Sequence, residues 1–102
     1  MSFIVVYVTN KNLEEAKKIS SHLLNKKLIA CSNIFPIKSM YLWKGNIEDS
    51  DEYVALLKAK KSNWKKIKEE IKKLHSYDAP CILKFKVNSN KEYENWLNSE
   101  SA

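Results

Sequence analysis

The chain has 102 residues, of which 44% are hydrophobic and 29% charged, with two Cys and a net charge of +6 carried by Lys without any Arg. This length predicts one compact domain over residues 1–102, with a core that folds without disulfides or a structural metal. Two Cys are too few for a disulfide-stapled mini-protein. No apolar run approaches the roughly 18 residues of a membrane span, and Met1–Phe3 lacks the basic residues of a signal peptide. These features together indicate a cytoplasmic protein.

The first half of the chain predicts a strand, a helix and a hairpin. Phe3–Val8 is a continuous apolar run, which indicates a strand buried on both faces. Asn12 and Glu15 have the spacing of a capping box, so a helix is expected to begin there and to end near Lys27. Its apolar positions are Leu13, Ala16, Ile19, Leu23 and Leu24. His22 falls about 180° from that face and is expected to be solvated.

Leu28–Trp43 is rich in β-forming residues but contains Pro36, which implies a bulge or a change of partner, so we expect either two strands or one bent strand. Gly45 and Asn46 mark a turn, and the acidic stretch Glu48–Glu52 separates it from strand residues Tyr53–Leu57. Together these signals predict a hairpin centred near Gly45.

The second half predicts a helix, a strand and a short helix. Ser62 is expected to cap a helix with an apolar face and a solvated lysine surface. Pro80–Val87 alternates apolar and lysine residues like a strand, and Ser89 with Glu92 repeats the capping-box spacing before a short C-terminal helix. The apolar helix positions are Trp64, Ile67, Ile71 and Leu74, then Tyr93, Trp96 and Leu97.

This order of elements, β-α-β-β-α-β with a terminal helix, is typical of an α+β, ferredoxin-like fold whose antiparallel sheet carries two helices on one face. A sheet with one wet face should alternate polar and apolar residues, but Phe3–Val8 and Val54–Leu57 do not. Leaving such side chains exposed would lose about 1.5–3 kcal/mol of hydrophobic stabilisation for each one. We therefore expect partner subunits to cover the second face.

Three segments in this order resemble the CutA family of divalent-cation tolerance proteins: Leu28–Asn33, Tyr41–Ile47 and Leu74–Pro80. Thr9, Glu52, Leu57–Lys58 and Tyr93–Leu97 extend the likeness over nearly the whole chain. The resemblance implies a tight homotrimer, similar in architecture to PII-type signalling proteins. It also implies a non-enzymatic role in tolerance to copper or other divalent cations, with no cofactor essential.

Several positions depart from the family pattern. Lys11 and Ser76 stand where relatives commonly have Pro, and Cys81 stands where an acid often follows Pro80. A copper-ligating Cys and the first of two His are replaced by Val8 and Leu74, so only His75 carries over. His75 is either a metal ligand or a structural histidine bonded to a loop carbonyl or a neighbouring subunit.

The family-matching positions Tyr41, Trp43, Glu52, Lys58 and Tyr77 are predicted to line a cleft between subunits. They serve either to pack the trimer interface or to bind a small anion or metabolite, with Lys58 supplying the charge. Cys31 and Cys81 are expected to be small buried hydrophobic residues, although a thiolate combined with His75 from an adjacent subunit would suit Cu(I).

Two other function classes fit less well. A basic RRM-like nucleic-acid-binding module shares the order of elements, but Tyr53–Lys60 has one aromatic residue and no Gly, so nucleic acid is not expected as a partner. An acylphosphatase-like enzyme would need the phosphate-binding Arg that this chain lacks, and no nucleophile motif is present. The sequence therefore predicts no catalytic residues.

Overall fold

The computed structural model describes residues 3–102, and the Met1–Ser2 start lies outside this range. An antiparallel sheet in the order β2-β3-β1-β4 carries the fold, which confirms the predicted ferredoxin-like architecture. The elements are β1 (Phe3–Asn10), α1 (Leu13–Asn25), β2 (Cys31–Trp43), β3 (Asn46–Ala59), a short 3-10 helix (Lys61–Asn63), α2 (Trp64–Leu74), β4 (Ile82–Val87) and α3 (Lys91–Glu100). Within the described range, none of the helices is both long and apolar enough to span a membrane.

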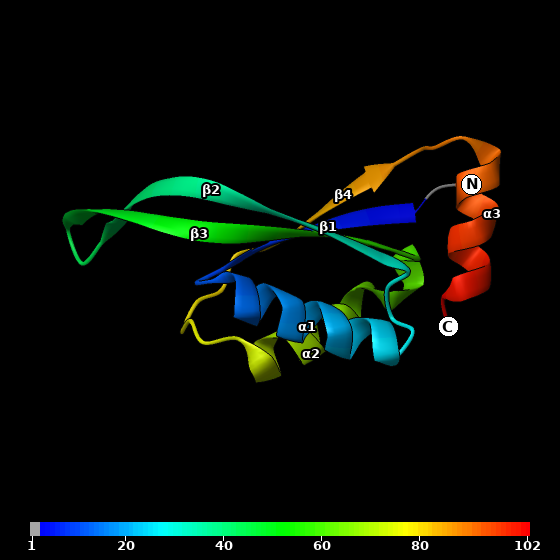
Figure 1. The fold of residues 1–102 in the computed structure, drawn as a ribbon, viewed down its shortest axis with the longest axis horizontal. Helices are drawn as coiled ribbons and strands as arrows, with labels where there is room; N and C mark the ends of the chain where they lie inside the picture. Colours follow the sequence, from blue (N-terminus) through cyan, green and yellow to red (C-terminus); the bar gives the residue numbers. More distant parts are fainter. Residues whose placement is uncertain (1–2) are drawn as a thin grey trace.

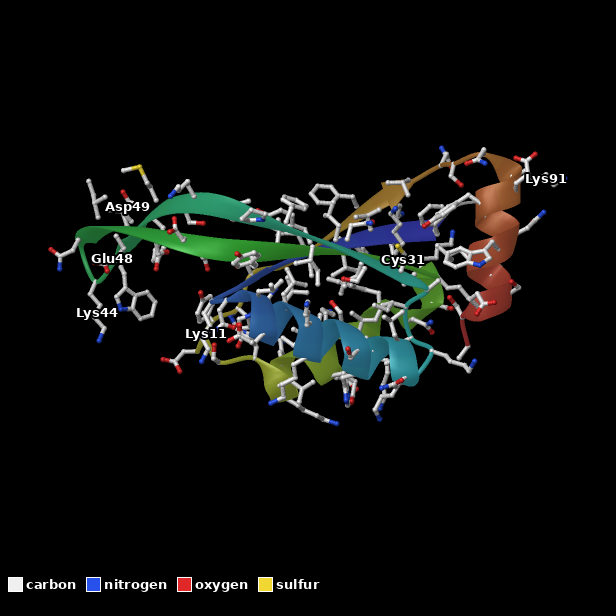
Figure 2. The ribbon with its side chains drawn as sticks, viewed as in Figure 1. Lys11, Cys31, Lys44, Glu48, Asp49 and Lys91 are labelled. Carbon is white, nitrogen blue, oxygen red and sulfur yellow. The ribbon has the colours of Figure 1, made fainter. Side chains whose placement is uncertain are left out.

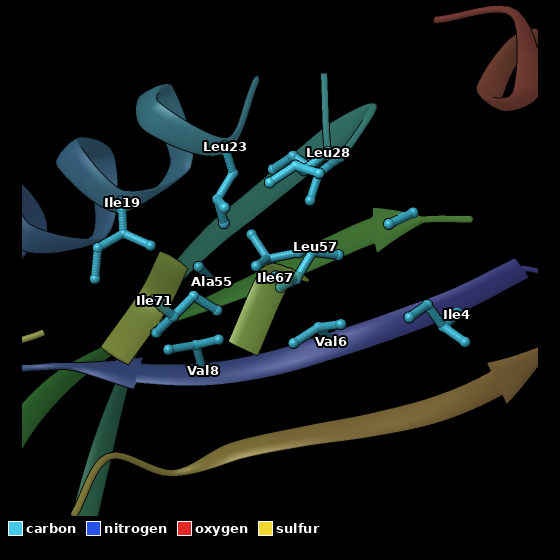
Figure 3. Close-up of a cluster of buried hydrophobic side chains, with 12 residues drawn as sticks. Ile4, Val6, Val8, Ile19, Leu23, Leu28, Ala55, Leu57, Ile67 and Ile71 are labelled. Atoms are coloured by element: carbon cyan, nitrogen blue, oxygen red, sulfur yellow. The ribbon is translucent and has the colours of Figure 1, made fainter. Parts of the chain in front are cut away.

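Helices α1 and α2 cover one face of the sheet, while α3 lies across one end (Figure 1). The core fills the space between these two helices and the sheet (Figure 3), because the helical periodicity of α1 and α2 turns their apolar positions inward. Leu24 is an exception to the predicted apolar face, since it is 40% exposed. The core residues are Ile4, Val6, Val8, Ile19, Leu23, Leu28, Ile29, Ala55, Leu57, Ala59, Ile67 and Ile71.

The opposite face of the sheet is apolar and carries no helix over most of its length. Register pairs Val5 with Phe85, Tyr7 with Leu83 and Leu56, and Phe35 with Val54, so these side chains share this side of the sheet. Phe35, Leu83 and Phe85 are 38%, 47% and 51% exposed. We call this surface the open face and define it by Val5, Tyr7, Phe35, Leu56, Leu83 and Phe85; Val54 lies on the same side but is buried.

Strand β2 is continuous through Pro36, so the predicted bulge or change of partner is wrong. Every residue from Cys31 to Trp43 has a partner in β3, without a gap in the register. Because β2 is an edge strand, Pro36 can lie where its missing N–H would face solvent rather than a neighbouring strand.

The β2-β3 hairpin is longer than predicted and projects beyond the helices (Figure 1). Its turn consists of Lys44 and Gly45, whose positive φ angles of 51° and 82° suit a two-residue hairpin loop, and this confirms the turn near Gly45. The acidic stretch Glu48–Glu52 belongs to β3, because each of its residues is paired with β2. Glu48 and Asp49 consequently point to opposite sides of the hairpin (Figure 2).

The helix starts agree with the sequence only at α1. There the Asn12 side chain accepts a hydrogen bond from the Glu15 N–H at 2.8 Å, as predicted. The predicted caps Ser62 and Ser89 are wrong, since α2 and α3 begin after Asn63 and Asn90 without a side-chain cap. The Asn63 amide instead donates to the Leu28 carbonyl at 3.1 Å, which ties the start of α2 to the loop between α1 and β2.

Glu70 joins α2 to α1 through His22, whose side chain is 32% exposed and therefore only partly solvated, in contrast to the prediction. The Glu70 side chain is 4% exposed and lies 2.7 Å from His22 Nε2 and 2.9 Å from Lys73 Nζ. Hydrogen bonds from His22 and then Lys73 outweigh the effect of burial and lower the pKa of Glu70 to about 2.

Acid is expected to remove the stabilisation that this carboxylate provides. A pKa below the ordinary value of 4.5 means that the contribution is present above about pH 4.5 and is lost as the pH falls toward 2. Urea unfolding at pH 6 and pH 3 should therefore show a smaller pH dependence for Glu70→Gln than for the wild type. Glu69→Gln, at an exposed neighbour, should behave like the wild type, and an unchanged pH dependence in Glu70→Gln would contradict the assignment.

Candidate functional site: a cleft beside the β2-β3 hairpin

A cleft of about 820 Å³ lies between the hairpin, the end of β1 and the loop that joins α2 to β4. We call it the hairpin cleft. Regular strand alternation brings its hairpin side chains together, because Tyr41 pairs with Glu48 and Ile37 with Glu52 on the same side of the ribbon. The lining consists of Tyr7, Thr9, Ile37, Lys38, Ser39, Met40, Tyr41, Trp43, Glu48, Glu52, Ser76, Tyr77, Asp78, Ala79 and Cys81.

The structure gathers four of the predicted cleft residues and separates the fifth. Tyr41, Trp43, Glu52 and Tyr77 line the hairpin cleft within one copy, whereas the sequence predicted a cleft between subunits. Lys58 lies elsewhere, opposite Cys31 in the register, with its Nζ 5.2 Å from the centre of the Tyr93 ring. The lysine expected to attract an anion is therefore absent from the lining.

Tyr77 and Glu52 form a fixed pair on the cleft wall. The Tyr77 hydroxyl donates to Glu52 Oε2 at 2.7 Å, and Glu52 is 7% exposed. Burial of the hydroxyl, together with its bond to this carboxylate, raises the pKa of Tyr77 above its ordinary value. Tyr77 therefore stays a neutral hydrogen-bond donor and keeps the Glu52 carboxylate satisfied.

His75 locks the loop that carries Tyr77, and both of its ring nitrogens are occupied. Its side chain is fully buried, Nε2 lies 2.7 Å from the Thr9 carbonyl oxygen, and Nδ1 accepts from the Tyr77 N–H at 3.1 Å. These partners require the neutral tautomer with the proton on Nε2. The bond to Thr9 is the loop-carbonyl contact that the structural alternative for His75 anticipated.

Glu15 holds the same loop from the side of α1. Its two carboxylate oxygens accept from the backbone N–H groups of Lys11 at 2.9 Å and Ser76 at 3.0 Å. Burial opposes ionisation of Glu15, but the hydrogen bonds from Ser76 and Lys11 outweigh it and lower the pKa. Glu15 and His75 together fix the start of the α2-β4 loop against β1 and α1.

Within the part of the chain that the structure describes, the metal-ligating side chains of a single copy do not form a binding site for a metal ion. A metal binds an unprotonated imidazole nitrogen, and His75 uses its only lone pair on the Tyr77 N–H. No group of three or more His, Cys, Asp or Glu side chains suited to a metal occurs between residues 3 and 102. Ligation by His75 would require one of its two hydrogen bonds to break.

The two cysteines are separate free thiols. Cys81 lies in the cleft lining, where burial and the nearby Glu52 charge raise its pKa and disfavour the thiolate that binds soft metals. Cys31 lies at the start of β2 and contacts Asn33 at 3.6 Å. Both are only partly buried, which is less than their expected role as buried hydrophobic residues requires.

Sequence reasoning missed several lining residues, chiefly Tyr7, Glu48 and Asp78. Glu48 was within reach of prediction, because a two-residue turn at Lys44–Gly45 places it directly opposite Tyr41. Tyr7 and Asp78 carried no such signal, because they enter the cleft only through the packing of β1 and the α2-β4 loop.

Comparison with known proteins places this fold among close relatives. The family model described as CutA1 divalent ion tolerance protein matches residues 4–100. The divalent-cation tolerance protein CutA of Thermotoga maritima is 46% identical over 95 residues, covering 92% of this chain and 94% of that protein. The crystal structure of CutA1 from Pyrococcus horikoshii superposes with a TM-score of 0.94 at 39% identity, covering 97% of this chain and 98% of that one. CutA1 from Oryza sativa gives a TM-score of 0.96 at 33% identity, with coverages of 100% and 95%.

Proposed function

Because the chain belongs to the CutA1 family of divalent ion tolerance proteins, we propose that it acts in divalent-cation tolerance as a non-enzymatic, homotrimeric binding protein. The open face is the observation that carries this proposal. In a single copy, Phe35, Leu83 and Phe85 are each between 38% and 51% exposed, whereas complete burial of such a side chain contributes about 1.5–3 kcal/mol. Self-association covers them, and the number of three subunits follows from the CutA resemblance.

The projecting hairpin supports the same proposal. Leu42 and Ile47 at its tip are 73% and 72% exposed and are paired with each other across the strands. Exposed apolar side chains gathered in this way are typical of surfaces that contact another protein. The hairpin therefore extends the surface on which a second copy packs.

Copper or another divalent ion is proposed to bind only where subunits meet. One copy supplies no group of three metal-binding side chains among the described residues, whereas two neighbouring copies can combine theirs. His75 joins such a site only by giving up its bond to Thr9 or to Tyr77. The metal is not needed for folding, because the apolar core already joins the helices to the sheet.

Copper titration by calorimetry tests this proposal. The wild type should bind about one copper ion per chain, because three subunits form three equivalent interfaces, and the double variant Phe35→Lys/Phe85→Lys, designed to separate the subunits, should lose that binding. Leu24→Lys is the matched control, because Leu24 is a similarly exposed apolar residue on α1, away from the open face. Equal copper affinity and stoichiometry in separated chains would contradict a shared site.

The other function classes gain nothing from the structure. An RRM-like module needs an open, base-stacking sheet face, but here that face has aliphatic residues beside its aromatic ones and is the surface proposed for self-association. A cytoplasmic location remains part of our proposal, supported by two cysteines that are both free thiols.

A further inference from the structure

The net positive charge of the chain is concentrated on its two packed helices. Over α1, the two residues that follow it, and α2, the sequence has nine lysines against four glutamates, so this layer carries five of the six net positive charges. The rest of the chain is nearly neutral, with nine lysines and eight acidic residues. We call this surface the basic helix face and define it by Lys17, Lys18, Lys26, Lys27, Lys65, Lys66, Lys68, Lys72 and Lys73.

Two of the four glutamates are turned inward. Glu15 is 7% exposed and accepts hydrogen bonds from two backbone N–H groups, and Glu70 is 3% exposed. Their negative charges lie beneath the lysines and are bound by groups of the chain itself. Glu14 and Glu69 are the exposed carboxylates of this layer, so lysine dominates the surface that meets solvent.

Glu70 also joins the lysines of the two helices into one continuous surface. Lys26, from the end of α1, and Lys66 and Lys73, from α2, lie 3.5, 3.9 and 2.9 Å from its carboxylate oxygens. Their side chains nevertheless stay 47%, 54% and 67% exposed. Because an ammonium group has three donors, each of these lysines can bind a further acidic group from outside.

The basic helix face stays accessible in the assembly proposed above. Helices α1 and α2 cover the side of the sheet opposite the open face, and the hairpin projects beyond them (Figure 1). Packing of further copies on the open face and the hairpin therefore leaves the outer side of the helices in solvent. All the lysines of the face come from one copy, so the face does not depend on a contact between subunits.

We propose that the basic helix face is a docking surface for an acidic polypeptide segment of a partner protein, which goes beyond the proposed function and does not rest on it. Opposite charges steer two such partners together and raise their rate of association. Lysine is a flexible point charge, so the face selects negative charge rather than one bidentate geometry. The carboxylates of an extended acidic segment are also on flexible side chains and can adapt to this arrangement of ammonium groups.

The composition of the face favours a polypeptide over nucleic acid or a lipid surface. Nucleic-acid recognition uses Arg, which the chain lacks, and aromatic rings for stacking. Trp64 is the one aromatic residue of α1 and α2, and the Nζ atoms of Lys68 and Lys84 already lie 4.8 and 5.3 Å from its ring centre. A helix that binds a membrane surface presents an apolar face to the lipid. Leu24 is the single exposed large hydrophobic residue of these two helices, both of which lie inside the described range.

A peptide of roughly ten residues that alternates Glu and Ser tests the proposal, because it can extend over the ~20 Å length of α1. NMR titration of the wild type at low salt should show saturable binding, with the shifted backbone amides gathered on α1 and α2. The same peptide with Gln in place of Glu should not bind. Added salt should weaken the binding of the acidic peptide, because salt screens exposed charges.

Reversing two charges on the face should weaken the binding of the acidic peptide. Lys65→Glu/Lys72→Glu leaves Glu70 and its ion-pair partners in place and should lower the affinity by about fivefold or more. Lys44→Glu/Lys91→Glu is the matched control and should keep most of the wild-type affinity. It changes the net charge equally, but at the two ends of the molecule, away from α1 and α2 (Figure 2). Circular dichroism should show that both variants are folded.

The proposal is overturned if the acidic peptide does not bind, if its Gln counterpart binds equally, or if the shifted amides lie outside α1 and α2. An equal loss of affinity in the two double variants would also overturn it, because net charge alone would then explain the binding. Tighter binding of single-stranded RNA of equal charge, or of phosphatidylserine vesicles, would replace the polypeptide by a nucleic acid or a lipid surface.

Discussion

Replacing Phe35 and Phe85 with lysine is expected to convert the proposed trimer into single chains. Both side chains lie on the open face, on strands β2 and β4, and both are partly exposed in one copy. An ammonium group placed there would have to be buried without a partner when a second copy covers the face. Each single copy would meanwhile gain solubility, because a lysine side chain can extend its charged end into water.

Sedimentation equilibrium measures this effect directly. The wild type should have the mass of three chains at micromolar concentration, and the double variant should have the mass of one. Leu24→Lys should stay assembled, because Leu24 lies on α1 and is 40% exposed on a different surface. Circular dichroism should show that all three proteins are folded. A wild type that sediments as a single chain would contradict self-association through the open face.

Replacing His75 with alanine is expected to lower the free energy of unfolding by about 2–4 kcal/mol, because it leaves the Thr9 carbonyl and the Tyr77 N–H without their partners. The ring also fills buried space, with its centre 4.8 Å from that of Tyr77, so the deletion opens a cavity. Urea unfolding at a fixed protein concentration measures the loss.

Two conservative variants separate the roles of the two ring nitrogens. The amide oxygen of His75→Asn can replace Nδ1 as the acceptor for Tyr77, and the amide nitrogen of His75→Gln can replace Nε2 as the donor to Thr9. Each should recover part of the stability that alanine loses. Copper binding should persist in all three variants, provided that they remain assembled. Loss of copper binding with unchanged stability would instead make His75 a metal ligand.

The fold was largely predictable, because local patterns and global packing agree in this chain. The apolar run in β1 and the helical periodicity of α1 and α2 each favour one structure. The errors occurred where tertiary contacts decide. Pro36 is tolerated because β2 is an edge strand, and the position of a strand in the sheet is not a local property. His22 looked solvated on its own helix, but the neighbouring α2 supplies Glu70.

The sequence predicted most of the residues that lie together at the candidate site, but not the charge of the site. Four of the five cleft residues were found because they match family positions, and they do lie together. The sign of the expected ligand charge depended on Lys58, which the register of β3 places beside Cys31 and Val5 rather than in the cleft. The carboxylates that replace it in the lining come from positions that have no common sequence motif.

By itself, the sequence determined the order of the elements, the core positions and the presence of apolar residues on both sides of the sheet, since these follow from periodicity that neighbouring residues share. Only the tertiary structure decided that His75 has no free nitrogen and that the hairpin cleft is acidic and aromatic. Each of these properties depends on atoms brought together from distant parts of the chain: His75 contacts Thr9, 66 positions earlier, and Tyr77 contacts Glu52, 25 positions earlier. Such contacts depend on how the helices pack on the sheet, so local sequence patterns do not predict them.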